Sequence, residues 1–237
     1  MLNRNRRWLK IWNKKGKNLK TKKLQDLINT NGFDSHIGKF DTKNWKKYIF
    51  SIEKKFKIRT GSLILEYGCG SGAFLFYFQK KKFDVYGIDY SRELIRKAKK
   101  IISPDFLKIG EYQKIKQFKK KFDIIISNSV FHYFKDLDYS KKVINEMSKN
   151  LSKNGKIIIL DIPDIKKKSR YFKDLNLKLG KKGLKKIISK KDHLFYSKLF
   201  FKKIGKKLKL KTIVADQQMR SYTNSKYRFN VCLYNKF

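Results

Sequence analysis

The sequence is poor in cysteine, proline and alanine, with two, two and three of these residues among 237. Cys69 and Cys232 are too few for a disulfide framework and lack the spacing of a metal site, so we expect reduced thiols and no bound metal. No apolar run approaches the ~18 residues of a membrane span. Residues 1–23 lack the apolar block and cleavage site of a signal peptide, which predicts a cytoplasmic protein.

Acidic residues are also scarce, because 61 Lys and Arg stand against 19 Asp and Glu, for a formal net charge of +42. Such a charge favours nucleic-acid binding, since a dense positive field recruits phosphates. Lysine, however, supplies 52 of the 61 basic residues and is spread through most segments, in the composition that AT-rich codons produce. We interpret most of the charge as solvated surface, with a functional basic patch as the alternative.

The most informative stretch, residues 64–73, is ILEYGCGSGA. It is an apolar strand that ends on a carboxylate and continues into three alternating glycines: Gly68, Gly70 and Gly72. A second apolar strand, residues 84–88, ends on Asp89. Glycines let backbone N–H groups approach a ligand, and a carboxylate at the tip of the next strand accepts from ribose hydroxyls. The pattern predicts a nucleotide site.

The glycine pattern alone also fits a dinucleotide fingerprint, with Asp89 at roughly the ~20-residue offset that this fingerprint expects. Glu66, two residues before the first glycine, would repel a pyrophosphate, whereas a ligand with a charged amino group tolerates it. The third glycine falls at Gly72, which gives Gly-x-Gly-x-Gly. This spacing opens the loop and does not need a helix N-terminus packed on phosphates, as a dinucleotide site does. A dehydrogenase therefore remains a minor alternative.

Three further segments follow the glycine stretch in order. Residues 122–134 (FDIIISNSVFHYF) are typical of a buried strand that opens into a polar, aromatic loop, and they are flanked by GIDYS at 87–91 and GKIIILD at 155–161. With EYGCGSG at 66–72, these motifs make the chain resemble the class I S-adenosylmethionine-dependent methyltransferases of the small-molecule branch, over about residues 60–165. The resemblance implies S-adenosylmethionine as cofactor. It also implies in-line methyl transfer to an O or N atom of a small polar metabolite, such as a sugar or an anionic compound.

Alternation of strands and helices predicts an α/β fold with a parallel sheet and right-handed crossovers. A short turn region, residues 220–225, precedes the final strand, which should therefore lie antiparallel to its neighbour. The resemblance implies a Rossmann-like, doubly wound, seven-stranded sheet. We expect the strands near residues 62–66, 84–88, 105–108, 122–128, 156–161, 208–216 and 227–234.

The chain divides, on this interpretation, into two parts. Residues 1–58 form a basic helical N-terminal extension or cap, with a Trp-bearing arm followed by helices near 19–29 and 43–56. A plain helical extension over the sheet edge and an amphipathic arm on a membrane surface are the alternatives. Residues 59–237 form the methyltransferase domain. Its insertion at 162–207, between the fifth and sixth strands, is expected on the substrate side.

The resemblance implies a set of cofactor contacts. The glycines lie beside the methionine part, Glu66 near its ammonium, Asp89 on the ribose and Tyr90 on the adenine. Glu111 replaces the Asp that the family often uses for the adenine edge, and Asn128 lies near the transferred methyl. An alternative for Asp89 is a helix N-cap. The predicted cofactor residues are Glu66, Gly68, Gly70, Gly72, Asp89, Tyr90, Glu111 and Asn128.

Histidine supplies the candidate general bases, because imidazole titrates near working pH. His132 follows the fourth strand, with a packed, hydrogen-bonded side chain as the alternative, and His193 lies in the insertion. Tyr196 and Lys198 are candidate substrate contacts, the lysine for an acidic group. His36, in an N-terminal turn, is a third candidate substrate contact.

The NSVF sequence at residues 128–131 argues against base methylation. Family members that methylate exocyclic amines of nucleobases usually carry Asn/Asp-Pro-Pro-aromatic at this place, and both prolines are absent here. The chain also lacks a Pro-Cys pair for covalent attack on pyrimidines. A small-molecule substrate is therefore expected, and an RNA methyltransferase that uses the basic surface is the alternative.

Overall fold

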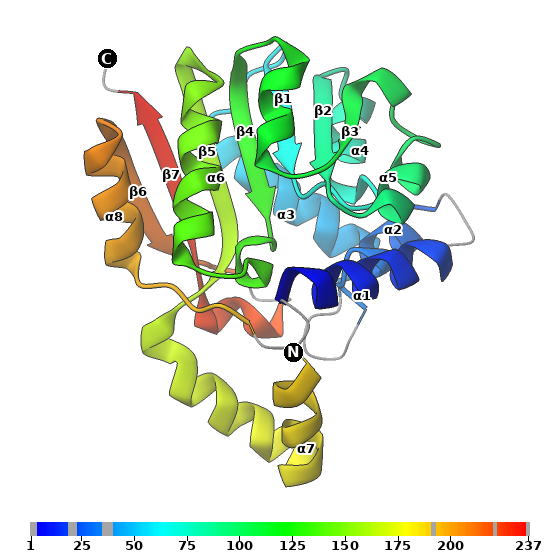
Figure 1. Cartoon of the computed structure of the whole chain (residues 1–237), viewed down its shortest axis with the longest axis vertical. Coiled ribbons are helices and arrows are strands. Elements are labelled where there is room, and N and C mark those ends of the chain that lie inside the picture. The colour runs from blue at the N-terminus through cyan, green and yellow to red at the C-terminus, as the bar shows by residue number, and fades with distance from the viewer. Residues whose placement is uncertain (1–3, 19–22, 35–39, 191–192, 220–221, 236–237) are drawn as a thin grey trace.

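A computed structural model of the chain describes residues 4–18, 23–34, 40–190, 193–219 and 222–235 (Figure 1). Seven strands form one sheet in the order β3-β2-β1-β4-β5-β7-β6. The strands are β1 (Leu63–Tyr67), β2 (Asp84–Asp89), β3 (Leu107–Ile109), β4 (Phe122–Asn128), β5 (Leu151–Pro163), β6 (Leu210–Asp216) and β7 (Arg228–Asn235). The first five pair in parallel, and β7 pairs antiparallel with both β5 and β6. The predicted sheet, including its reversed last strand, is confirmed.

Helices cover both faces of the sheet (Figure 1). They are α1 (Arg4–Asn18), α2 (Leu24–Thr30), α3 (Thr42–Lys55), α4 (Ala73–Lys80), α5 (Arg92–Ala98), α6 (Leu137–Lys149), α7 (Lys168–Lys190) and α8 (Lys198–Lys207). Short 3₁₀ segments connect them: η1 (Pro104–Phe106), η2 (Tyr112–Phe118), η3 (Phe131–Tyr133), η4 (Ile165–Lys167) and η5 (Thr223–Tyr227). Within the described residues, no helix is both long and apolar enough to cross a membrane.

The core follows from the near-continuous apolar runs of the central strands, which are buried on both faces as parallel strands require. Successive side chains of a strand point to opposite faces. In β4, Ile124 and Ile126 pack with the helices α2 to α5, whereas Ile125 packs on the other face with α6 and α8. The seven-stranded sheet thereby separates two apolar layers and brings the carboxyl ends of β1, β2 and β4 to one edge.

The N-terminal arm is itself a helix, α1, which the sequence prediction did not assign. Trp8 and Trp12 lie one turn apart and therefore share one face of the helix. Both are buried, and they pack with Leu94 of α5 in a small separate cluster. The predicted helix near 19–29 begins at Leu24, and residues 19–22 lie outside the described residues.

The predicted insertion at 162–207 contains two different structures. Helix α7 bends at Gly180, whose φ is +67°, and extends away from the sheet at the bottom of Figure 1. Helix α8, in contrast, packs on the sheet through Phe201 and Ile204. The second half of the insertion, α8, is thus one of the helices that cover the sheet.

Candidate functional site

The glycine loop after β1 has a backbone that only glycine adopts easily. Gly68 and Gly70 have φ values of +80° and +55°. A Cβ at Gly68 would lie 2.5 Å from Val130 Cγ2, and one at Gly70 would lie 2.4 Å from Asn31 Oδ1. Both positions therefore require glycine for conformation and for space. The loop can turn tightly and still let two neighbouring segments approach its backbone.

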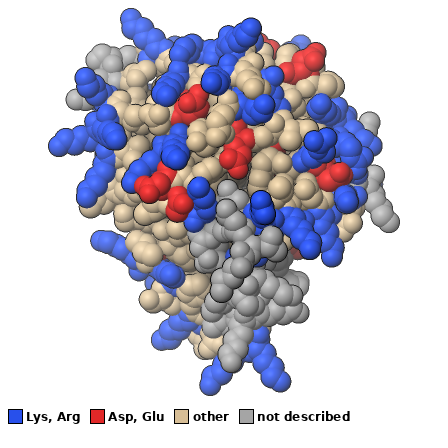
Figure 2. All heavy atoms as spheres, in the orientation of Figure 1, with Lys and Arg blue, Asp and Glu red and all other residues tan. Residues whose placement is uncertain are grey.

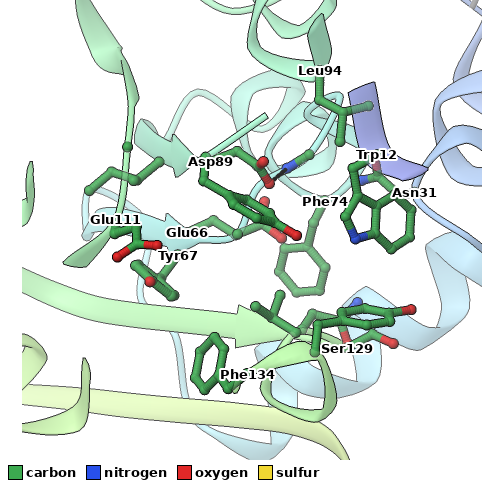
Figure 3. Close-up of a pocket in the computed structure, with 18 of the residues that line it drawn as sticks. Trp12, Asn31, Glu66, Tyr67, Phe74, Asp89, Leu94, Glu111, Ser129 and Phe134 are labelled. Atoms are coloured by element: carbon green, nitrogen blue, oxygen red, sulfur yellow. Dashed lines mark hydrogen bonds between the residues drawn. The ribbon is translucent and has the colours of Figure 1, made fainter. Parts of the chain in front are cut away.

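This loop forms one wall of a pocket with about 820 Å³ of empty space, its open mouth included. Figure 3 shows Trp12 and Asn31 on one side of the pocket and Glu111 on the other, with Asp89 and Glu66 between them. Gly72 does not line the pocket; it begins α4 and faces Ile101. The structure brings the other seven predicted cofactor residues together in the lining: Glu66, Gly68, Gly70, Asp89, Tyr90, Glu111 and Asn128.

Asp89 ties the second strand to the glycine loop. Its Oδ2 accepts from the Gly70 N–H at 2.9 Å, and its Oδ1 accepts from the Ser91 N–H at 2.8 Å. Burial raises the pKa of Asp89 to about 6, while the two backbone N–H bonds act in the opposite direction. The N-cap of α5 is Ser91, so the alternative role of Asp89 as that cap is wrong. Each carboxylate oxygen keeps a second lone pair for a ligand hydroxyl.

Glu66 is the most unusual group in the pocket. It is 2% exposed, and its Oε2 has no hydrogen-bond partner among the described residues. Burial, and next the charge of Asp89, raise the pKa of Glu66 well above its usual range. A buried carboxylate without a partner is unfavourable unless a cationic or hydrogen-bonding group meets it. The pocket therefore suits a ligand that carries a positive charge at this end.

The N-terminal helices close the other side of the pocket, through residues that the sequence analysis did not select. Asn31 follows α2 and accepts hydrogen bonds from Ser71, and Trp12 of α1 lines the pocket. Asn13 of α1 accepts from the Ser91 hydroxyl at 2.7 Å. The sequence signals were the Asn31-Gly32 pair, typical of a helix end, and the tryptophans spaced one turn apart.

The sequence of the chain matches the family model described as "Methyltransferase domain" over residues 58–218. The chain belongs to this methyltransferase family. It is 32% identical over 127 residues to the ubiquinone biosynthesis O-methyltransferase of Pelagibacter ubique, a match that covers 46% of this chain and 48% of that protein. It is 28% identical over 103 residues to an uncharacterized methyltransferase of Anoxybacillus flavithermus, covering 44% of this chain and 48% of that protein. The chain spans about half the length of the curated relatives it matches.

Solved methyltransferase structures share the fold of this family member. The plantazolicin methyltransferase BpumL in complex with SAH aligns with a TM-score of 0.62 and 16% identity, covering 98% of this chain and 99% of that one. The magnesium protoporphyrin IX methyltransferase of Synechocystis with bound SAH aligns with a TM-score of 0.58 and 15% identity, covering 90% and 98%. At these identities the likeness concerns the fold, and the seven-stranded sheet with a reversed β7 is the class I methyltransferase fold.

The two candidate bases of this family member lie together, but behind the pocket. The ring centroids of His132 and His193 are 4.7 Å apart, and that of His132 lies 4.0 Å from Tyr133, which lines the pocket. The Leu194 N–H donates to the His132 carbonyl and fixes the two segments together. Burial, and next the electrostatic effects of His193 and Arg228, lower the pKa of His132 well below its usual value. Its imidazole is therefore neutral at working pH.

The predicted substrate residues of the insertion, Tyr196 and Lys198, are not in the pocket lining. Tyr196 is fully buried, donates its hydroxyl hydrogen to the Phe131 carbonyl at 2.8 Å and lies 2.7 Å from the Ser140 hydroxyl. Lys198 pairs at 2.6 Å with Asp216. Both side chains thus hold α8 and η3 in place. His36 lies outside the described residues.

Two residues at the carboxyl ends of β4 and β5 have strained backbones. Ser129 and Asp161 have φ values of +59° and +60°, which non-glycine residues seldom adopt. Ser129 lines the pocket, and its hydroxyl donates to Asp161 Oδ2 at 2.6 Å. The hydroxyl of Tyr222 donates to the same oxygen at 3.1 Å. These two residues lie at the wall where the pocket meets a second group of polar side chains.

Proposed function

We propose that this protein transfers a methyl group from S-adenosylmethionine to an O or N atom of a small polar metabolite. The observation that carries the proposal is the Glu66 carboxylate, buried and without a partner for Oε2, beside Asp89 in a pocket walled by the glycine loop. A nucleoside that carries an ammonium group on an amino acid chain matches both carboxylates at once, with the ammonium at Glu66 and the ribose hydroxyls at Asp89.

The lining residues fit S-adenosylmethionine group by group. Glu66 would meet the ammonium, the loop at Gly68 and Gly70 the methionine part, and Asp89 the ribose hydroxyls. Tyr90 and Glu111, which also line the pocket, would hold the adenine. When bound, S-adenosylmethionine supplies a methyl group on a positively charged sulfur that is already activated for displacement.

Asn128 and Ser129 would orient the acceptor beside the cofactor. The Asn128 side-chain oxygen accepts from the buried Tyr48 hydroxyl at 2.9 Å, which fixes its rotamer. A fixed polar group at this place can hold the acceptor atom in line, and good alignment is worth roughly 7–11 kcal/mol in favourable cases. The protein supplies mainly geometry, and the imidazole of His132 or His193, behind the pocket wall, would accept the proton.

A small metabolite is favoured over RNA by the surface charge. In Figure 2, Lys and Arg are scattered over the visible face with Asp and Glu between them, rather than gathered in one stripe. Several pair with carboxylates, as Lys81 does with Glu53 and Lys226 with Asp174. We further infer that residues 1–58 act as a cap over the methyltransferase domain at 59–237, because α1 and α2 contribute Trp12 and Asn31 to the pocket.

The test is transfer of labelled methyl from S-adenosylmethionine into a cell extract, separated into a macromolecular half and a half of small metabolites. Label in the metabolite half is expected, and it should disappear with Asp89→Ala. Label found only in RNA would show that the substrate is RNA and not a small metabolite. Absence of S-adenosylhomocysteine binding to the purified protein by calorimetry would refute the proposal itself.

A further inference from the structure

A group of buried polar side chains lies directly behind Ser129, and the proposed cofactor site does not use it. We refer to Asp161, Tyr222, Arg228 and His132 as the Arg228 cluster. All four are buried. Ser129 lines the pocket, and its hydroxyl contacts the cluster through a 2.6 Å hydrogen bond to Asp161. The cluster is therefore one hydrogen bond away from the pocket.

Arg228 is the central residue of this cluster. It is the first residue of β7 and is 4% exposed, yet its Nε and Nη1 have no hydrogen-bond partner among the described residues. The carboxylate oxygen Oδ1 of Asp161 lies 3.7 Å from Nε, beyond the 2.7–3.2 Å typical of such a bond. Asp161 instead accepts from the hydroxyls of Ser129 and Tyr222. Arg228 has a counterion but retains N–H groups to donate.

Other groups near Arg228 share this property. His132 Nδ1, Gln217 Oε1 and Asn224 Oδ1 are also buried without a hydrogen-bond partner in the described part of the chain. The Gln217 amide nitrogen lies 3.4 Å from Asp161 Oδ1, which places that side chain at the cluster. Buried polar groups in folded proteins are nearly always partnered. Gln217 Oε1 and Asn224 Oδ1 are acceptors, so among these unpartnered groups the charged N–H donors of Arg228 are the ones suited to an anionic part of a ligand.

Arg228 remains charged in this environment. Burial opposes its charge, but Asp161, and after it the tyrosines at 222, 171 and 133, raise the pKa of Arg228 above its ordinary value. A guanidinium in a buried, aromatic setting recognises oxyanions strongly. Lys226, two residues away, offers no such site because it is half exposed and pairs with Asp174.

We propose that Arg228 binds a carboxylate of the methyl-acceptor substrate, whose acceptor atom lies next to Ser129. This inference rests on the proposed function and names its substrate class: a small acid. A carboxylate fits better than a phosphate because Asp161 already offsets much of the Arg228 charge. One arginine beside a carboxylate suits a monoanion and repels a dianion.

The test uses the full chain saturated with S-adenosylhomocysteine and compares benzoate with benzamide by NMR titration. Benzoate suits the aromatic surroundings, and the amide has the same shape without the charge. Wild type should bind benzoate at least ~10-fold more tightly than benzamide, and Arg228→Gln should reduce this preference to within ~2-fold. Lys226→Gln, a charge removal two residues away, should keep the wild-type preference.

The outcomes separate this inference from the proposed function. Failure of wild type to bind S-adenosylhomocysteine would refute the proposed function. Binding of S-adenosylhomocysteine without a benzoate preference, or with the same preference in Arg228→Gln, would overturn the Arg228 assignment alone. Inorganic phosphate competing as well as benzoate would overturn the choice of a carboxylate. If Arg228→Gln does not fold, Arg228→Lys replaces it as the test. Arg228→Lys should weaken benzoate binding at least ~3-fold, and a smaller effect would overturn the assignment.

Discussion

The side-chain oxygen of Asn31 accepts a hydrogen bond from the Ser71 N–H at 2.8 Å and another from the Ser71 hydroxyl at 2.9 Å. These bonds fasten the end of α2 to the glycine loop, and the missing side chain of Gly70 makes room for them. The N-terminal helices are therefore part of the pocket wall.

Asn31→Ala should weaken S-adenosylhomocysteine binding roughly 5- to 10-fold. The substitution leaves the Ser71 N–H without its acceptor, a loss of about 1–3 kcal/mol for a buried donor, and releases α2 from the loop. Isothermal titration calorimetry measures the affinity. Asn154→Ala, at an exposed position, is the matched control and should bind like wild type. Equal affinities for the two variants would show that the loop keeps its shape without α2.

Asp89 should make cofactor binding depend on pH. Burial raises the pKa of Asp89 to about 6. Only the ionised carboxylate accepts from both ribose hydroxyls, so S-adenosylhomocysteine affinity should fall about 10-fold between pH 7 and pH 5. Asp89→Asn should bind weakly, with that step removed. Because Glu66 also titrates, the comparison is made in the Glu66→Gln background, where calorimetry across this range would contradict the assignment if Asp89→Asn kept the step.

The same pKa has a consequence for stability. A carboxyl whose folded pKa is raised binds its proton more tightly in the folded state than in the unfolded state. Its contribution to the free energy of unfolding therefore falls as pH rises from about 4 to about 6, and is constant above that window. Asp89→Asn should make this fall smaller than in wild type in urea unfolding, and the fall that remains is due to Glu66, whose pKa is also raised.

Glu66 should release a proton when the cofactor binds. Burial and Asp89 raise the pKa of Glu66 in the free protein, and an ammonium group beside it would lower that pKa again. Calorimetry at pH 7.5 in buffers of different ionisation enthalpy should detect net proton release on S-adenosylhomocysteine binding. Glu66→Gln should abolish the release and weaken binding by about 10-fold or more. Asp105→Asn, at an exposed site, should change neither.

Alanine substitutions at two glycines distinguish the stability cost of backbone strain from the cost of crowding. Gly61 and Gly68 have φ values of +83° and +80°, but a Cβ meets nothing within 4 Å at Gly61 and Val130 at 2.5 Å at Gly68. Gly61→Ala should cost about 1 kcal/mol of unfolding free energy, for strain alone. Gly68→Ala should cost about 2–4 kcal/mol because the loop must also move. If both variants lost the same unfolding free energy in urea, the Val130 side chain would be able to move aside without cost.

The sequence predicted the strands well because their signals are local. Apolar runs bounded by turn residues placed β2 and β4 within a residue, and the short turn before β7 predicted its reversal. The glycine loop and Asp89 were found because they adjoin those strands. Helix α1 was missed because its many lysines and arginines mask an apolar stripe of only a few residues, among them Trp8 and Trp12.

The Arg228 cluster could not be predicted for a different reason. Ser129, Asp161 and Arg228 come from three strands, and the register of β5 with β7 is what brings the last two together. In the sequence, Arg228 is one of 61 basic residues, and nothing local distinguishes a buried arginine from a solvated one. His132 and His193 were selected by residue type, but their 4.7 Å approach depends on the Leu194 backbone bond.

The place of β7 affects how the molecule is completed during synthesis. This strand lies between β5 and β6, although it leaves the ribosome after both. Until then β5 has an open edge and β6 lacks its neighbour in the sheet, so both present unpaired backbone groups to chaperones and to other nascent chains. Arg228, the first residue of β7, reaches its place in that same late step. A chain still attached to the ribosome therefore lacks the Arg228 cluster until β7 pairs with β5.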